Sequence, residues 1–272
     1  DRIAERRPCG VEGQMRDDGM CCLVRKEGKL ELVKSDKILT GPQRIAQIIQ
    51  CKERCPDGEG RSVFIANSHL SFPGDEDPNI NDKKQAKEAG IILEALTKAS
   101  TEWDTGNERL EVVSGDFNSD SCGLAASHVE SHNFVNCASA AAEQMLTHIG
   151  GQVNIGVTHC NHLGENVSVD HIFLRLAKKM EKKSHNENGN VGGRSAALSL
   201  GFLDTKGTRI LNVRRGNILL EGSTVLSDHR PVTAKIAWPR ITKPKKEILC
   251  PELYVNVTRP LDPLEPAWGI VE

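Results

Sequence analysis

Residues 114–120 read Ser-Gly-Asp-Phe-Asn-Ser-Asp (SGDFNSD), and they follow a short run that contains Leu110, Val112 and Val113. The apolar run predicts a strand over 110–114, and the polar residues begin where that strand ends. Glycine, aspartate and asparagine are also the usual residues of surface turns. The stretch therefore has two interpretations. It is either a turn, or a strand end that presents an acid, Asp116, and an amide, Asn118, for chemistry.

Three other segments have the same design, in which an apolar strand ends in polar residues that suit a phosphate or a metal. They are Asn67-Ser-His-Leu70, Val169-Asp-His171 and Ser227-Asp-His-Arg-Pro231. Each segment alone also fits a structural role, such as a buried core histidine at His69, an Asx turn at 116–118, or a capping aspartate at Asp170 or Asp228.

Taken together and in this order, the four segments resemble the endonuclease/exonuclease/phosphatase superfamily. This superfamily includes pancreatic-type deoxyribonuclease, abasic-site endonucleases, poly(A) deadenylases, sphingomyelinases and inositol polyphosphate 5-phosphatases. Asp18-Gly19 before the run Met20–Arg25 is also similar to a strand of the family, and the resemblance spans roughly residues 17–237. It implies an α/β fold, a four-layer α-β-β-α sandwich with two packed mixed β-sheets and helices outside.

Hydrolysis of a phosphate ester requires an in-line attack by water and stabilisation of negative charge. Asp116 is the candidate to orient and deprotonate the water, and Asn118 can donate a hydrogen bond without adding negative charge. By the resemblance, His229 donates to a phosphate oxygen and Asp170 orients its ring. The same resemblance places His69 at the scissile phosphate from the other side.

The remaining candidates concern the metal and the substrate. Asp228 is the candidate metal ligand, for Mg²⁺ or Mn²⁺, because an oxygen-rich site with few carboxylates suits a hard cation that also binds substrate oxygens. Asn67 and His171 are candidate substrate-binding residues. A zinc site built from Cys51, Cys55, His159 and His162 is a weaker alternative, because the two pairs are distant and loosely spaced. We expect His159 and His162 instead at the mouth of the cleft.

The glutamate that the superfamily uses as its chief metal ligand has no counterpart in this sequence. In the family an asparagine on the first strand and this glutamate on the next both precede the Asp-Gly strand. Here seventeen residues precede Asp18, and neither Glu5 nor Glu12 ends an apolar strand. We expect a chain that lacks the N-terminal strands of the family. The alternative is a degenerate member that no longer catalyses.

The predicted function is metal-dependent hydrolysis of phosphate esters, with a nuclease or other phosphodiesterase as the first choice. The alternatives are a lipid or inositol phosphate phosphatase, and a catalytically inactive binding or scaffold domain. The expected partner is nucleic acid or another phosphate-ester substrate. Neither a Gly-x-Ser-x-Gly elbow nor a Gly-x₄-Gly-Lys loop occurs, which excludes the serine-hydrolase and P-loop interpretations.

The composition suits one large domain, with 272 residues of which 38% are hydrophobic. The nine cysteines are odd in number and lack the spacing of a disulfide-rich domain, which favours a reducing compartment, cytoplasmic or nuclear. No apolar run approaches the ~18 residues of a membrane span. The net charge of −2 predicts no partner.

The predicted domain covers residues 1–238, with a basic insertion at about 176–208, and residues 239–272 are predicted to be a proline-rich linker or arm. Arg175 to Arg215 contains ten Lys or Arg against three Asp or Glu. This stretch is either a solvated insertion or a positively charged rim that attracts a polyanion.

The hydrophobic pattern predicts the other elements. We expect a hairpin of Met20–Arg25 and Lys29–Val33, and a strand at Ser62–Ser68. A helix is expected at Asp82–Ser100 with Asn81 or Asp82 as its cap, and further strands at Val169–Arg175 and Val232–Trp238. Gln43–Gln50 fits a strand or a helix. Ile210–Val213 and Ile218–Leu220 are expected to pair.

Overall fold

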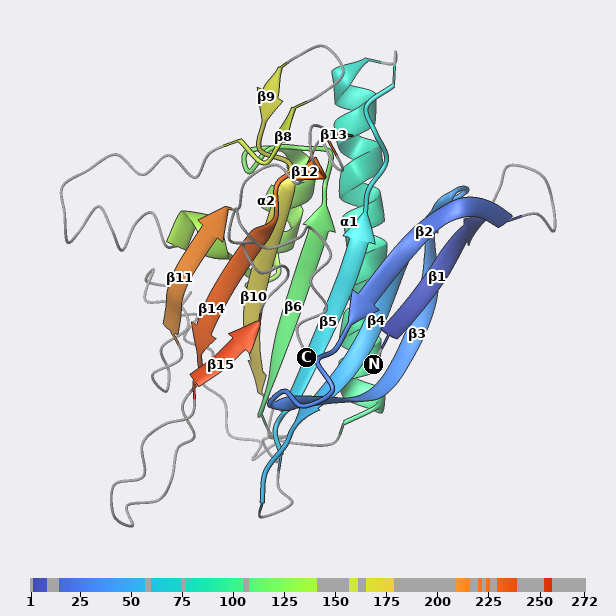
Figure 1. The fold of residues 1–272 in the computed structure, drawn as a ribbon. Coiled ribbons are helices and arrows are strands. Elements are labelled where there is room, and N and C mark those ends of the chain that lie inside the picture. The colour runs from blue at the N-terminus through green and yellow to red at the C-terminus, as the bar shows by residue number, and fades with distance from the viewer. Residues whose placement is uncertain are drawn as a thin grey trace, which may run out of the picture.

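A computed structural model gives the fold of the chain (Figure 1). It describes residues 2–8, 15–56, 60–74, 77–104, 108–140, 157–160, 165–178, 209–215, 220–221, 224–225, 229–238 and 252–255. Among these residues, no helix has both the length and the apolar character needed to cross a membrane.

The centre of the fold is a six-stranded mixed sheet. Its spatial order is β3 (Leu30–Gly41), β4 (Arg44–Glu53), β5 (Ser62–His69), β6 (Glu108–Asp116), β10 (Asp170–Lys178) and β7 (Val135–Asn136). Neighbouring strands are antiparallel except for β5 and β6, which run parallel. A parallel pair needs a crossover, and α1 (Pro78–Glu102) provides it.

Helices cover one face of this sheet and shorter sheets lie on the other (Figure 1). The helices are α1 and α2 (Leu124–Ser131). The second layer contains a two-stranded sheet of β1 (Arg2–Pro8) and β2 (Met15–Leu23), and a three-stranded sheet of β11 (Arg209–Arg215), β14 (Val232–Ala237) and β15 (Glu252–Val255). Short pairs are formed by β8 (His159–Cys160) with β9 (Asn166–Val167), and by β12 (Leu220–Glu221) with β13 (Thr224–Val225).

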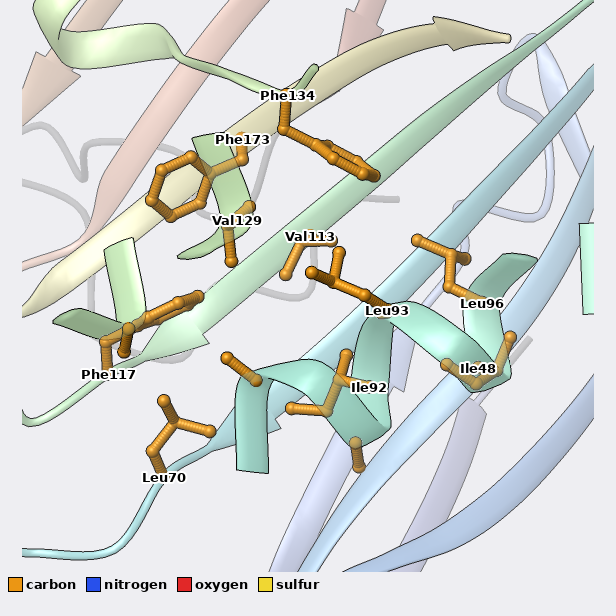
Figure 2. Packing of buried hydrophobic residues seen from close by; sticks show 14 of the residues in the cluster. Ile48, Leu70, Ile92, Leu93, Leu96, Val113, Phe117, Val129, Phe134 and Phe173 are labelled. Carbon is orange, nitrogen blue, oxygen red and sulfur yellow. The ribbon is translucent and has the colours of Figure 1, made fainter. Parts of the chain in front are cut away.

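Alternation along the strands gives the central sheet two buried faces. Phe64 and Ala66 of β5 pack towards the helices, in the cluster that Figure 2 shows with Ile92, Leu93 and Leu96 of α1. Val63 of β5 and Val112 of β6 lie on the opposite face, with Ile236 and Trp238 of the second layer. The described part is thus an α-β-β arrangement, which confirms the predicted α/β class with packed sheets. An outer fourth layer is not among the described elements.

Helix α1 has a buried stripe that changes character along its length. The stripe recurs every three or four residues, from Asn81, Gln85 and Glu88 to Ile92, Leu93 and Leu96. The second half is apolar and packs in the core, whereas the first half is polar. The polar half lies beside the loops that follow β5 and β6, as the hydrogen bonds described below show.

Several predicted elements are confirmed. The strands expected at Ser62–Ser68, Leu110–Ser114, Val169–Arg175 and Val232–Trp238 are β5, β6, β10 and β14. The ambiguous Gln43–Gln50 lies in β4. The helix begins earlier than expected, because Asp77 is its cap and accepts a hydrogen bond from the Asn79 amide (2.8 Å), with Pro78 opening the first turn. The prediction of Asn81 or Asp82 as the cap is therefore wrong.

Two predicted strand pairings are wrong. Residues 20–25 and 29–33 do not pair with each other, because β2 pairs with β1 and β3 pairs along its length with β4. Likewise β11 pairs with β14, and Leu220 pairs with Val225. In the first case β3 forms its long ladder with the next strand along the chain, across the tight turn between Gly41 and Arg44. In the second case β11 pairs with the more distant β14, and Leu220–Glu221 forms a short hairpin with Thr224–Val225. Residues 252–255 of the predicted arm also pair, with β14, while residues 239–251 and 256–272 lie outside the described residues.

A buried carboxylate connects β6 to β10 on the helix-covered face. Glu111 is fully buried and accepts hydrogen bonds from Arg175 Nε (2.7 Å) and Arg109 Nε (3.2 Å). Arg175 also donates to the His132 carbonyl beyond α2 and lies over the Phe134 ring. Glu111 thus holds two guanidinium groups in place, and through Arg175 it also fixes the segment after α2.

We expect Glu111→Gln to destabilise the fold by about 3 kcal/mol, because breaking a buried charge pair leaves guanidinium groups without a counter-charge. Urea unfolding should show a lower midpoint with an unchanged slope. Glu102→Gln, at an exposed position of α1, is the matched control and should leave the midpoint unchanged. Equal midpoints for both variants would contradict the structural role of Glu111.

Candidate active site

Three polar side chains form a row across the edge of the central sheet where β5 and β6 end. The strand register places His69 beside Asp116, and Asp116 opposite Asp170. Each of the three lies an even number of residues from a residue of its own strand that faces the second layer, namely Val63, Val112 or Ile172. Because side chains alternate along a strand, the three polar side chains lie on that same face, beyond its buried apolar part. Figure 1 shows this edge, where β8 and β9 also lie.

His229, from the segment before β14, completes the row. Its Nδ1 lies 2.9 Å from Asp170 Oδ2, and its Nε2 lies 3.7 Å from Asp116 Oδ2. On the other side of Asp116, His69 Nε2 lies 3.5 Å from the same oxygen. The four residues predicted as His69, Asp116, Asp170 and His229 are thus brought together. The predicted pairing of Asp170 with the His229 ring is seen directly.

Asp116 is a carboxylate in an unfavourable place for its charge. Burial and the neighbouring Asp170 raise the pKa of Asp116 from 3.8 to about 6, against the hydrogen bond that its Oδ1 accepts from the Asn118 amide. A carboxyl group with a pKa of about 6 is still mainly ionised at neutral pH. It is also a far better proton acceptor than an ordinary aspartate.

His69 is held neutral at physiological pH. Burial, Arg44 and Arg7 lower the pKa of His69 from 6.5 to about 4, in that order of importance. Its 3.5 Å approach to Asp116 is therefore not an ion pair at pH 7, although the distance alone would suggest one. The two arginines come from the end of β1 and the start of β4, and they make this side of the row electropositive.

The loop after β6 has the backbone that its sequence requires. Gly115 has φ 139°, and a Cβ there would collide with the Ser68 carbonyl of β5. Asn118 has φ 49°, in the left-handed region, and its Nδ2 donates to the Leu70 carbonyl (2.9 Å). Asn118 therefore follows Asp116 in the same turn, but its side-chain amide donates to a backbone carbonyl and not towards the row, and it holds the loops after β5 and β6 together.

Two buried side chains from the polar half of α1 support these loops. Gln85 Nε2 donates to the carbonyls of Ser71 (2.8 Å) and Asn118 (3.0 Å), and the Glu88 carboxylate accepts from the Ser71 amide (2.7 Å). The sequence analysis missed both residues. The signal was present, because Gln85 lies one helical turn before Ala89 on the predicted buried face and is polar there.

Thr158 supports the other half of the row, and the sequence analysis missed it too. Its buried hydroxyl accepts from the amides of Val169 (3.0 Å) and Asp170 (3.1 Å). Its carbonyl accepts from the Arg230 amide (2.7 Å). One threonine thereby joins the start of β10 to the segment that carries His229.

The predicted substrate-binding residues lie apart from the row or at its margin. Asn67 is on the same face as His69, two residues earlier, and its Nδ2 lies 3.5 Å from Cys22 Sγ. His171 points to the opposite face, where it is buried between Phe117 and Phe173 and its Nε2 lies 2.9 Å from the Ser119 carbonyl. The structure does not bring His171 to the cluster, because a one-residue step in a strand reverses the face.

The predicted metal ligand, Asp228, lies outside the described residues. Within the part of the chain that the structure describes, no three His, Cys, Asp or Glu side chains are grouped to hold a metal ion. Burial raises the pKa of the Cys51 thiol to about 11, which disfavours the thiolate form that zinc binds. His162 and residues 179–208 of the basic stretch also lie outside the described residues.

Comparisons with known proteins agree with this architecture. No protein-family model and no curated protein matches the chain. Solved structures do match. An endonuclease/exonuclease/phosphatase from Bacteroides vulgatus is 17% identical with a TM-score of 0.53, and the match covers 87% of this chain and 75% of that one.

The chain has the endonuclease/exonuclease/phosphatase fold. A mannosyl-6-phosphatase from Bacteroides thetaiotaomicron also matches, at 14% identity and a TM-score of 0.51 over 88% of this chain and 77% of that one. The human Nocturnin catalytic domain matches at 18% identity and a TM-score of 0.47 over 64% of this chain, and the match spans 60% of the Nocturnin domain. The endonuclease/exonuclease/phosphatase fold predicted from the four motifs is confirmed.

We expect the buried charge of Asp116 to cost stability. The folded chain keeps this group protonated up to about pH 6 whereas the unfolded chain releases the proton near pH 3.8, so stability falls as the pH rises through this window. Asp116→Asn should therefore stabilise the protein at about pH 7.5, by about 2 kcal/mol more than at about pH 4.5. Thermal unfolding at the two pH values measures the difference. A gain that is equal at both would contradict the raised pKa.

Proposed function

We propose that the protein hydrolyses phosphate esters, with Asp116 and His229 acting on the reacting phosphate. The observation that carries the proposal is the row His69, Asp116, Asp170 and His229, assembled from three strands and a distant segment. A base with a raised pKa, an oriented histidine and a neutral histidine at one sheet edge match the needs of phosphoester hydrolysis.

Proton transfer would be divided between Asp116 and His229. Asp116 accepts the proton of the attacking water, because its pKa of about 6 lies near neutral pH. Asp170 holds Nδ1 of His229, which directs Nε2 towards Asp116 and the reacting group. The 3.7 Å between that Nε2 and Asp116 Oδ2 exceeds a direct hydrogen bond, and a water or phosphate oxygen bound there would contact both.

The charges around His69 suit an anionic substrate. Burial lowers the pKa of His69 most, and Arg44 and Arg7 lower it further, so two positive charges lie near this end of the row. A phosphate oxygen there would gain charge-assisted interactions, while neutral His69 can still donate one N–H. We infer an anionic phosphate-ester substrate, with a phosphodiester such as nucleic acid as the first choice.

A phosphomonoester is the second candidate substrate. It is favoured by one structure with this fold and a TM-score above 0.5, which is by name a mannosyl-6-phosphatase. Both substrate classes need the same row of side chains.

We expect wild-type protein with Mg²⁺ to hydrolyse bis(p-nitrophenyl) phosphate faster than p-nitrophenyl phosphate, and the reverse order would favour the monoesterase. Asp116→Asn and His229→Gln should each lower kcat by about 100-fold or more, because each removes a group for proton transfer. Asp120→Asn is the matched control, an exposed acid in the same loop, and should retain full activity. Full activity of Asp116→Asn would refute its assignment as the base.

Metal dependence is the second test. We propose that Mg²⁺, or Mn²⁺, supplies charge stabilisation at the phosphate, with Asp228 as its predicted ligand. EDTA should then abolish hydrolysis, and added Mg²⁺ should restore it. Phosphate binding without any hydrolysis, with or without metal, would favour the scaffold interpretation.

A further inference from the structure

The His229 ring has a second histidine against its face. The rings of His159 and His229 are stacked, with centroids 4.2 Å apart and planes inclined by 25°. The two residues also form an antiparallel β-bridge, so their backbones are paired as well as their rings. His159 was expected only at the mouth of the cleft, and the structure places it in direct contact with the row.

The hydrogen bond to Asp170 alone does not determine how the His229 ring is oriented. It restrains Nδ1, at 2.9 Å from Asp170 Oδ2, but a ring held at one atom can still turn about that contact. The side chain of His229 is 30% exposed, so the surrounding protein encloses it only in part. A flat group packed on the ring face removes the remaining rotation, and His159 is placed to do this.

The backbone of His159 is itself firmly held. The preceding residue, Thr158, donates its amide to the Val167 carbonyl (2.9 Å) and accepts from the Arg230 amide through its own carbonyl (2.7 Å). Its hydroxyl accepts from the Asp170 amide (3.1 Å). His159 is therefore fixed relative to Asp170 and to Arg230, the residue after His229. Asp170 holds Nδ1 of the His229 ring, and Arg230 fixes the backbone from which that ring extends.

We propose that His159 is a positioning residue for His229, whose stacked ring holds the His229 plane so that Nε2 faces Asp116 and the reacting phosphate. The catalytic consequence rests on the proposed phosphoesterase function, whereas the effect on the His229 ring does not. Nearly parallel rings meet through their faces, so His159 acts by packing rather than by exchanging a proton with His229.

The kinetic experiment compares His159→Ala, which removes the stacked ring, with His159→Phe, which keeps a flat ring without nitrogens. With bis(p-nitrophenyl) phosphate and Mg²⁺, we expect the alanine variant to lose about tenfold in kcat with little change in KM. The phenylalanine variant should stay within about twofold of wild type. A phenylalanine variant as slow as the alanine variant would overturn the proposal, because it would show that the imidazole nitrogens matter.

A matched control is available in another histidine pair among the described residues. His128 and His132 contact edge to face, with centroids 4.7 Å apart, on the helix-covered side of the sheet. His132→Ala removes an exposed imidazole of the same kind and should leave kcat unchanged. A tenfold loss in this control would mean that the loss in His159→Ala is not specific to the stack, and would overturn the proposal.

Nuclear magnetic resonance tests the ring orientation without any enzymatic activity. The full chain with ¹⁵N-labelled histidine should show one His229 tautomer, protonated on Nδ1 towards Asp170, with His229→Gln used for assignment. We expect His159→Ala to broaden or average these signals and His159→Phe to preserve them. Unchanged His229 signals in His159→Ala would overturn the proposal. Absence of hydrolysis by wild type would count against the proposed function alone.

Discussion

The hydrogen-bond register across β5, β6 and β10 is the constraint on which the site depends. Backbone pairing sets His69, Asp116 and Asp170 in one row, and the period of two places all three on the face that meets the second layer. A shift of one residue in any of these strands would send its polar group into the helix-covered core. The apolar residues earlier in the same strands prevent that shift, because Val63, Val112 and Ile172 are buried against the second layer.

This placement makes the ionised forms of Asp116 and His69 electrostatically unfavourable. The resulting pKa shifts are the property that the proposed phosphoester hydrolysis would use. Asp116 is largely enclosed next to another carboxylate, and half-buried His69 lies near two arginines. Each environment shifts the pKa in the direction that favours the neutral form of the side chain. The raised pKa of Asp116 lowers stability at neutral pH, whereas the lowered pKa of His69 lowers stability only below about pH 6.5. Perturbed pKa values of this kind cluster at functional sites. The surrounding structure offsets the cost elsewhere, as in the fully buried Glu111 with its two guanidinium partners.

The loops that carry the row are held from behind by buried polar side chains. Gln85 and Glu88 from α1 bind the backbone after β5 and β6, and Thr158 joins the start of β10 to the His229 segment. These hydrogen bonds go mainly to backbone atoms, which is why they define loop positions closely. The site is therefore built from strand ends, with a supporting layer drawn from a helix and a short β-bridge segment.

The sequence alone predicted the central strands from the local spacing of apolar residues, and it predicted the α/β class and the four members of the row through the resemblance of its four ordered motifs to the endonuclease/exonuclease/phosphatase superfamily. The requirement for glycine at 115 comes from the tertiary structure, because β5 lies too close there for a side chain. The tertiary structure decided the strand pairings, the inward face of His171, and the roles of Gln85, Thr158 and His159. Each of these depends on contacts between residues far apart in the chain, such as His159 with His229, whose geometry the order of residues does not specify.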